Sequence, residues 1–400
     1  MPRLWIVQST HRILIVTSWA PPMVGGPRNF YHLVSEFPPE SYAILTRNGL
    51  VPSAGADHVG RLVAPASESP TGTAGVAGQL LRVLRVATPV PTLVTIAAMV
   101  RRGVAVVRRG GITRILGVSD NGPALIAAHQ ISRRTGVPYA LYLYDLYRGN
   151  HLAPFDRLLA NFTEHTLLRG AKPVIVTNEA TESCYRTRYA HLDLAVVYNS
   201  VRGSDYASYR TPYRPAPPYA IVFTGHVYWA QRQSVLNMVR AMEELEDLPV
   251  HLDLYTPRPN RKLAAAVRAT PRVRVLSAPA ASMPAVQSRA TLLFLPLAWN
   301  TPSRQIIATA SPGKLTDYLA AGRPLLIHAP AYAFVTQYAR RHDLGVVVDV
   351  NDHRALAHAV RRYLQDPTVG ERFAQNAARL FAAGYEAKAN ATRLWSLLSH

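Results

Sequence analysis

Continuous apolar segments that alternate with segments of helical periodicity constrain the fold of this 400-residue chain most strongly. The first apolar segment, 13–17, is uninterrupted, which is typical of a strand that helices cover on both faces. Helical segments such as 122–134 and 155–169 follow strands in the chain. The alternation predicts an α/β fold with parallel sheets and crossover helices. Further strands are expected at 43–46, 115–118, 139–143, 174–177, 219–223, 250–254, 273–276, 291–295, 324–327 and 345–348.

A proline-rich segment separates two series of strands. Residues 200–218 carry four prolines among polar and aromatic residues, a composition typical of a linker. We expect an N-terminal Rossmann-like domain over 1–200, a linker over 201–218 and a C-terminal Rossmann-like domain over 219–375. A C-terminal helix over 376–400 is expected to pack near the domain junction.

The composition favours a cytoplasmic protein with a hydrophobic core. Of the residues, 48% are hydrophobic and 17% charged, which excludes disorder over most of the length. The single cysteine, Cys184, cannot form an intramolecular disulfide, and no secretory leader is recognised. The longest uncharged apolar run, 86–100, contains two prolines and is shorter than the roughly 20 residues that a spanning helix needs. We therefore expect no membrane-spanning helix.

The net charge of +20 favours an anionic partner, either nucleic acid, an anionic membrane surface or a phosphorylated substrate. Basic residues are spread through both halves and form no recognisable nucleic-acid-binding module. Nucleic acid is therefore not expected as a partner. Only four of the 44 basic residues are lysines, so a lysine in a candidate site is more informative than an arginine.

Two loops after strands are candidate ligand sites, because ligands of parallel sheets bind beyond the carboxyl ends of the strands. The first loop carries Gly25 and Gly26, whose backbone can approach a ligand closely, although an ordinary glycine turn remains an alternative. The second loop predicts a helix with Ser311 as its N-cap, Pro312 as its first residue and a stop at Gly322.

That second helix would place a cation and a carboxylate on one face. Lys314 would meet a phosphate at the helix N-terminus, and Asp317, three residues later, would accept hydrogen bonds from a sugar hydroxyl pair. A local Lys–Asp pair at a helix start is the alternative. No Asp-x-Asp, His-Glu-x-x-His or Gly-x-Ser-x-Gly motif occurs, and no histidine stands at metal-ligand spacing. Neither a metal nor another cofactor is therefore expected.

Three segments in order resemble the GT-B glycosyltransferases, especially the retaining enzymes of family 4, also called glycosyltransferase group 1. They are Pro21-Pro22-Met23-Val24-Gly25-Gly26 after the first strand, Val222-Phe223-Thr224-Gly225 with the following 226–231, and Ser311 to Pro324. The resemblance covers nearly the whole chain. It implies two Rossmann-like domains whose parallel sheets face each other across a cleft, with 1–200 as the acceptor domain and 219–375 as the nucleotide-sugar donor domain.

The resemblance also implies site residues. The family's two glutamates, seven residues apart, fall on Thr309 and Asp317, so only the second position keeps a carboxylate. The family's His-Asp pair appears as Tyr144-Asp145. Catalytic roles are implied for Gly25, Gly26, Asp145 and Lys314. Donor binding is implied for Gly225, His226, Arg232, Arg304, Thr309, Ser311, Pro312, Gly313, Lys314 and Asp317.

The implied activity is metal-independent transfer of a sugar, with retention of configuration, from a nucleotide-sugar donor to an acceptor hydroxyl. The acceptor would be a glycan, a lipid-linked molecule or a small molecule, and a cell-envelope glycan would fit. Two alternatives remain open: a catalytically impaired GT-B protein that acts as a binding or scaffolding partner, and a nucleotide-sugar epimerase or hydrolase of the same fold.

A basic segment indicates contact with a membrane. Residues 69–119 contain no acidic residue, and Arg101, Arg102, Arg108 and Arg109 would form a stripe on a helix among apolar residues. Such a helix can lie on anionic lipid, although a helix that covers the core of the first domain explains the apolar residues equally well. We expect a cytoplasmic protein, with peripheral attachment to the inner face of the plasma membrane as an extension.

Overall fold

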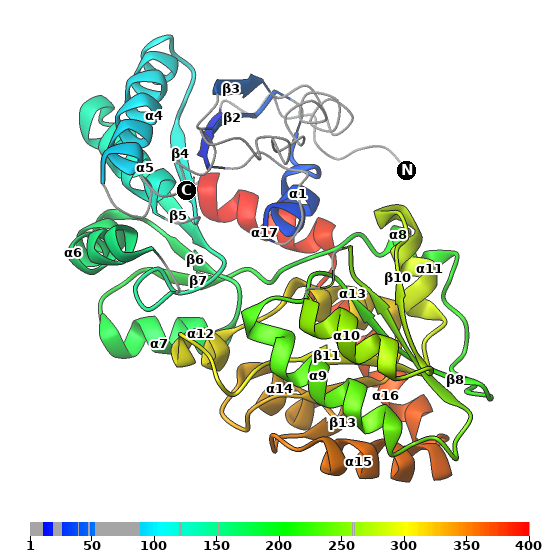
Figure 1. The fold of residues 1–400 in the computed structure, drawn as a ribbon. Coiled ribbons are helices and arrows are strands. Elements are labelled where there is room, and N and C mark those ends of the chain that lie inside the picture. Colours follow the sequence, from blue (N-terminus) through cyan, green and yellow to red (C-terminus); the bar gives the residue numbers. More distant parts are fainter. Residues whose placement is uncertain are drawn as a thin grey trace. The chain divides into compact units, whose positions relative to one another are not determined.

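The chain forms two compact units, each built around one sheet (Figure 1). The computed structural model describes residues 11–18, 26–38, 40–46, 49–52, 89–119, 122–150, 153–257, 259 and 261–399. The first unit comprises 1–200 together with 387–400, and the second comprises 201–386.

The first unit contains a seven-stranded sheet in the order β3-β2-β1-β4-β5-β6-β7. All neighbouring strands pair in parallel except β2 and β3, which are antiparallel. The strands are β1 (Ile13–Val16), β2 (Tyr42–Thr46), β3 (Gly49–Pro52), β4 (Arg114–Val118), β5 (Tyr139–Leu143), β6 (Val174–Val176) and β7 (Leu194–Val196). The helices are α1 (Gly26–Val34), α4 (Val90–Arg108), α5 (Pro123–Thr135), α6 (Pro154–Gly170), α7 (Glu179–Arg188) and α17 (Ala387–Ser399).

The C-terminal helix α17 belongs to the core of the first unit. Leu394, Trp395 and Leu398 pack with buried side chains of α1 and the sheet, and the Trp395 ring meets Phe37 edge to face at 5.1 Å. Arg114 of β4 donates to the Leu398 carbonyl at 3.0 Å. Within the segment expected to form one helix over 376–400, the structure has the end of one helix, a break at Tyr385 and Glu386, and then α17.

The second unit contains a six-stranded, wholly parallel sheet in the order β10-β9-β8-β11-β12-β13. The strands are β8 (Tyr219–Thr224), β9 (Val250–Tyr255), β10 (Val273–Leu276), β11 (Leu292–Pro296), β12 (Leu325–His328) and β13 (Gly345–Val348). The helices are α8 (Ser204–Ala207), α9 (Trp229–Glu243), α10 (Arg261–Ala269), a 3₁₀ turn at Ala280–Ser282, α11 (Met283–Ser288), α12 (Arg304–Thr309), α13 (Gly313–Ala321), α14 (Phe334–His342), α15 (His353–Gln365) and α16 (Val369–Gly384).

The α/β class predicted from the alternating segments is confirmed, and each expected strand is present within one or two residues. Strands β3 and β7 were not among the expected strands, because segments of four and three residues carry little periodicity. The segment 201–218, expected as a linker, packs into the second unit instead. It contributes α8 and two buried tyrosines, Tyr206 and Tyr213.

Helix α4 has 19 residues and extends beyond the apolar run 86–100, whose shortness led us to expect no membrane-spanning helix. Among the described residues it is the one helix whose length and composition would allow it to cross a membrane, since it continues past Arg101 and Arg102 to Arg108. By itself this is weak evidence. The second half of α4 is part of the core, because Val104, Val107 and Gly103 are buried and Gly103 lies against Ile131 of α5.

Candidate functional site

The order of the strands locates a candidate site in each unit. In each sheet the first strand lies in the interior, and the chain adds strands first on one side of it and then on the other. The connections that follow β1 and β4, and those that follow β8 and β11, therefore run in opposite directions. A parallel sheet binds ligands beyond the carboxyl ends of its strands at such a point. In the second unit the loop after β8 and the segment with α12 and α13, which follows β11, meet this condition.

Gly225 makes the turn directly after β8. Its φ of 114° lies in a region that L side chains rarely adopt, so glycine is required there for conformational reasons. A Cβ built on Gly225 would stand 3.7 Å from Cε and 3.8 Å from Nζ of Lys314. The sequence-predicted residues Gly225 and Lys314 are therefore neighbours, although 89 positions separate them in the chain.

Lys314 is held in a poorly solvated position at the start of α13. Its Nζ lies 4.7 Å from the centroid of the Phe223 ring, a cation–π distance. Burial lowers the pKa of Lys314 to about 8, and the nearby Asp317 carboxylate opposes this shift. Nζ has no hydrogen-bond acceptor among the described residues. An ammonium beside the free N–H groups of a helix N-terminus can bind a phosphate.

Asp317 lies one turn further along α13 and is buried, with 5% of its surface exposed. The Tyr206 hydroxyl of α8 donates to Asp317 Oδ1 at 2.8 Å. The structure thus brings Gly225, Lys314 and Asp317 into one neighbourhood. It also places a tyrosine there that the sequence analysis did not single out.

Helix α13 starts later than predicted. Pro312 has φ −57° and ψ 136°, which makes it the N-cap, and Gly313 is the first helical residue. The assignments of Ser311 as N-cap and Pro312 as first helical residue were therefore wrong by one position each. The fixed φ of proline is compatible with extended as well as helical backbone, so the sequence alone could not decide between them. The predicted stop at Gly322, in the left-handed conformation, is confirmed.

The remaining predicted donor residues lie on the loop after β8, on α9, on α12 and at the start of α13. His226 and Arg232 are exposed on the loop after β8 and on α9. Arg304 is exposed at the start of α12, with its guanidinium 4.4 Å from the centroid of the Tyr332 ring. Thr309 is buried, and its hydroxyl donates to the Gln305 carbonyl of the same helix at 3.0 Å.

In the first unit, Asp145 follows β5 at the carboxyl edge of the sheet. Burial raises the pKa of its carboxyl to about 6. Gly26 is the first residue of α1, which follows β1 at the same edge, whereas Gly25 lies outside the described residues. The predicted role of the glycine loop therefore stays a prediction.

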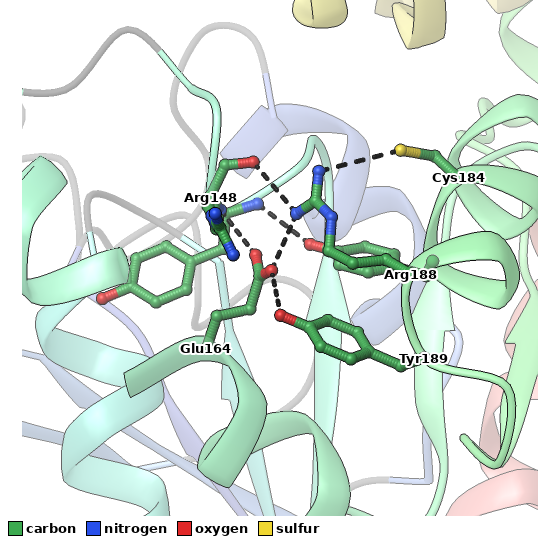
Figure 2. A network of polar contacts seen from close by, with 7 residues as sticks. Arg148, Glu164, Cys184, Arg188 and Tyr189 are labelled. Carbon is green, nitrogen blue, oxygen red and sulfur yellow. Dashed lines mark hydrogen bonds and ion pairs between the residues drawn. The ribbon is translucent and has the colours of Figure 1, made fainter. Parts of the chain in front are cut away.

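A buried carboxylate secures the segment after Asp145. Figure 2 shows Glu164 of α6 between Arg148, Arg188 and Tyr189. The Arg148 N–H donates to Glu164 Oε2 at 2.6 Å, while Arg188 Nη1 and the Tyr189 hydroxyl donate to Oε1 at 2.8 and 2.9 Å. Glu164 is fully buried, so its charge depends on these three donors for stabilisation.

Two further hydrogen bonds hold the same loop. The Tyr147 N–H donates to the hydroxyl of Tyr185 at 2.9 Å, and the Thr177 hydroxyl donates to the Tyr144 carbonyl at 2.9 Å. The backbone on both sides of Asp145 is thus bonded to α6, α7 and the end of β6. Such a loop presents a carboxylate in a defined position, which a catalytic or substrate-binding group requires.

Sequence reasoning missed Tyr206 and Glu164 for a physical reason. Both act through contacts between elements distant in the chain, and neither belongs to a motif. The one sequence feature that could have indicated a buried carboxylate is the position of Glu164 on the apolar face of its helix. Among the described residues, no group of three or more His, Cys, Asp or Glu side chains could hold a metal ion.

Comparisons with known proteins agree with this geometry. Residues 218–366 match the family model described as "Glycosyl transferases group 1". A search of curated proteins found no match. The solved structures that resemble this chain include HepE from Anabaena in complex with UDP and glucose, with 14% identity over 97% of this chain and 99% of HepE and a TM-score of 0.67.

Two further structures show the same likeness. A glycosyltransferase from Rickettsia africae has 10% identity over 97% of each chain and a TM-score of 0.68. Sucrose-phosphate synthase from Thermosynechococcus elongatus has 17% identity over 76% of this chain and 77% of that protein, with a TM-score of 0.59. At these identities the likeness shows a shared fold.

Proposed function

Because this protein is a glycosyltransferase with a group 1 domain over residues 218–366, we propose that it transfers a sugar from a nucleoside-diphosphate donor to an acceptor hydroxyl with retention of configuration. The GT-B architecture expected from the sequence is confirmed by the fold shared with HepE. The observation that supports the proposal most directly is that Lys314, Gly225 and Asp317 lie close together beyond the carboxyl ends of β8 and β11.

The proposed chemistry follows from the charges in this neighbourhood. Breaking the anomeric C–O bond leaves negative charge on the departing diphosphate. The Lys314 ammonium and the N–H groups at the start of α13 would stabilise that charge in a poorly hydrated site. Asp317 would accept hydrogen bonds from the ribose. In the first unit, Asp145 would contact the acceptor, on its firmly held loop.

We test the activity by incubating the protein with UDP-, GDP- and ADP-sugars, with and without candidate glycan acceptors, and measuring released nucleoside diphosphate. We propose metal independence, so EDTA should leave turnover unchanged, and proton NMR should show a product with the donor's anomeric configuration. Loss of turnover in EDTA with rescue by Mg²⁺ or Mn²⁺ would contradict metal independence. Inverted product would contradict the retaining mechanism, and release without transfer would favour a hydrolase.

We further propose that the protein works in the cytoplasm, attached to the inner face of a membrane and acting on a lipid-linked acceptor. Helix α4 supports this, because Val90 and Val94 are 59% and 61% exposed. Arg101 and Arg108 are also exposed and follow on the same helical face. An apolar first half and a basic second half suit a helix that lies on anionic lipid.

Flotation with vesicles tests the membrane proposal. The protein should float with phosphatidylcholine vesicles that contain phosphatidylglycerol, and high salt should release it, since each arginine near the surface contributes about 1 kcal/mol. The double variant Val90→Ser, Val94→Ser should float less, whereas Arg354→Ser, an exposed arginine of α15 in the second unit, should behave like the wild type. Absence of flotation at low salt would contradict the proposal.

A further inference from the structure

A chain of buried polar side chains runs from the end of β8 to Asp317. The Tyr206 hydroxyl lies 2.8 Å from Asp317 Oδ1 and 2.8 Å from the side-chain amide of Gln287. Nε2 of the same Gln287 amide lies 3.0 Å from the Thr224 hydroxyl. Tyr206, Gln287, Thr224 and Asp317 are all buried. The four side chains come from α8, α11, β8 and α13.

The number of protons available determines which group donates in each of these hydrogen bonds. A tyrosine hydroxyl has one proton to donate, and an ionised carboxylate can only accept. The Tyr206 proton therefore goes to Asp317, and the Gln287 amide, whose Oε1 faces Tyr206 in the structure, satisfies the Tyr206 oxygen when its two ends are exchanged so that its N–H donates to that oxygen. The two ends of a side-chain amide are assigned from such networks. In that orientation the amide oxygen of Gln287 accepts from the Thr224 hydroxyl, in place of the Nε2–H that the structure directs at Thr224.

The chain starts at the turn that carries the phosphate-binding candidates. Thr224 is the last residue of β8 and precedes Gly225. Its N–H donates to the Tyr318 hydroxyl at 3.0 Å, so α13 is bonded to the end of β8 at a second point. Because each bond lies in a buried site, breaking one leaves an unsatisfied polar group and is costly. The side chain of Asp317 is thus fixed relative to Gly225.

We propose that Tyr206 and Gln287 are positioning residues that hold the Asp317 carboxylate for the ribose hydroxyls of a nucleoside diphosphate. The inference rests on the proposed function, because it assigns the ribose of the donor to Asp317. A carboxylate fixed by a donated proton accepts further hydrogen bonds from a restricted direction. It therefore distinguishes a ribose from a deoxyribose better than a freely rotating carboxylate would.

The test compares ribonucleotides with their 2′-deoxy forms by calorimetry, using UDP, GDP and ADP and their deoxy counterparts. We expect the wild type to bind its preferred ribonucleotide roughly 10- to 100-fold more tightly than the deoxy form, as a hydrogen bond to a charged group implies. In Tyr206→Phe this preference should fall below about threefold, while affinity for the deoxy form stays nearly unchanged. Gln287→Leu should reduce the preference in the same direction.

A matched control separates positioning from general damage. Tyr213→Phe removes another buried tyrosine hydroxyl of this unit, one that donates to the Thr291 carbonyl, and should keep the ribose preference. An unchanged preference in Tyr206→Phe, or an equal loss of affinity for both nucleotide forms, would overturn the inference alone. If Tyr206→Phe does not fold, Gln287→Leu decides by the same criterion. A wild type that binds no nucleotide would overturn the proposed function and this inference together.

Discussion

Replacing Lys314 with methionine is expected to weaken binding of the preferred nucleoside diphosphate by about 10- to 100-fold, measured by calorimetry at pH 7. A hydrogen bond from a charged donor contributes about 1.5–3 kcal/mol, and each 1.4 kcal/mol changes the dissociation constant tenfold. The effect is expected near the upper end, because the ammonium lies over the Phe223 ring and is poorly hydrated. Methionine keeps the length of the side chain and removes the charge.

The same lysine predicts a pH dependence. Burial lowers its pKa to about 8, so the ammonium is charged at pH 7 and loses its proton as the pH rises through 8. Wild-type affinity for the diphosphate should therefore fall between pH 7.5 and 9, and that of Lys314→Met should stay flat. Lys262→Met, at an exposed lysine of α10, is the control and should behave like the wild type. Wild-type affinity in Lys314→Met would refute the phosphate-binding role.

Replacing Glu164 with glutamine should destabilise the first unit and reduce turnover. Glutamine turns one of the two carboxylate oxygens into a donor, which then faces either the Arg148 N–H or the pair formed by Arg188 and Tyr189. Breaking a buried ion pair costs about 3–5 kcal/mol. For a unit of this size we expect the melting temperature of the first unit to fall by roughly 6–20 °C in differential scanning calorimetry.

A second measurement links Glu164 to the loop that carries Asp145. Hydrogen exchange at Arg148 should accelerate in Glu164→Gln more than exchange in β5, because the Arg148 N–H loses its carboxylate acceptor. Glu182→Gln, in an exposed pair with Arg186 on α7, should change the melting temperature by less than about 2 °C. Equal effects of Glu164→Gln and Glu182→Gln would show that the network does not secure this loop.

The sequence predicts the sheets well and the site in part. Continuous apolar segments such as 13–17 and 291–295 suffice to identify buried parallel strands, because such strands have no polar face. Lys314 and Asp317 could be placed together because they share one helix. Gly225 could be placed near them because the family resemblance supplied its loop.

The contacts that hold the site could not be predicted from the sequence. Tyr206 reaches Asp317 across 111 positions in the chain, and its own segment looked like a linker because prolines follow it. The burial of Glu164 depends on Arg148, Arg188 and Tyr189, which come together only when α6 and α7 pack. Helix α17 likewise packs in the first unit through Trp395 and Leu398. Its periodicity shows that it has an apolar face but does not show which unit that face contacts.

Amide hydrogen exchange with and without a saturating nucleotide sugar tests the central claim most directly. UDP-glucose is the first probe, because the related fold of HepE has been solved with it. The account predicts slower exchange over 225–232 and 311–317, and unchanged exchange over α15 (His353–Gln365) in the same unit. Binding with protection elsewhere in the chain, or failure of every UDP-, GDP- and ADP-sugar to protect these two segments, would contradict it.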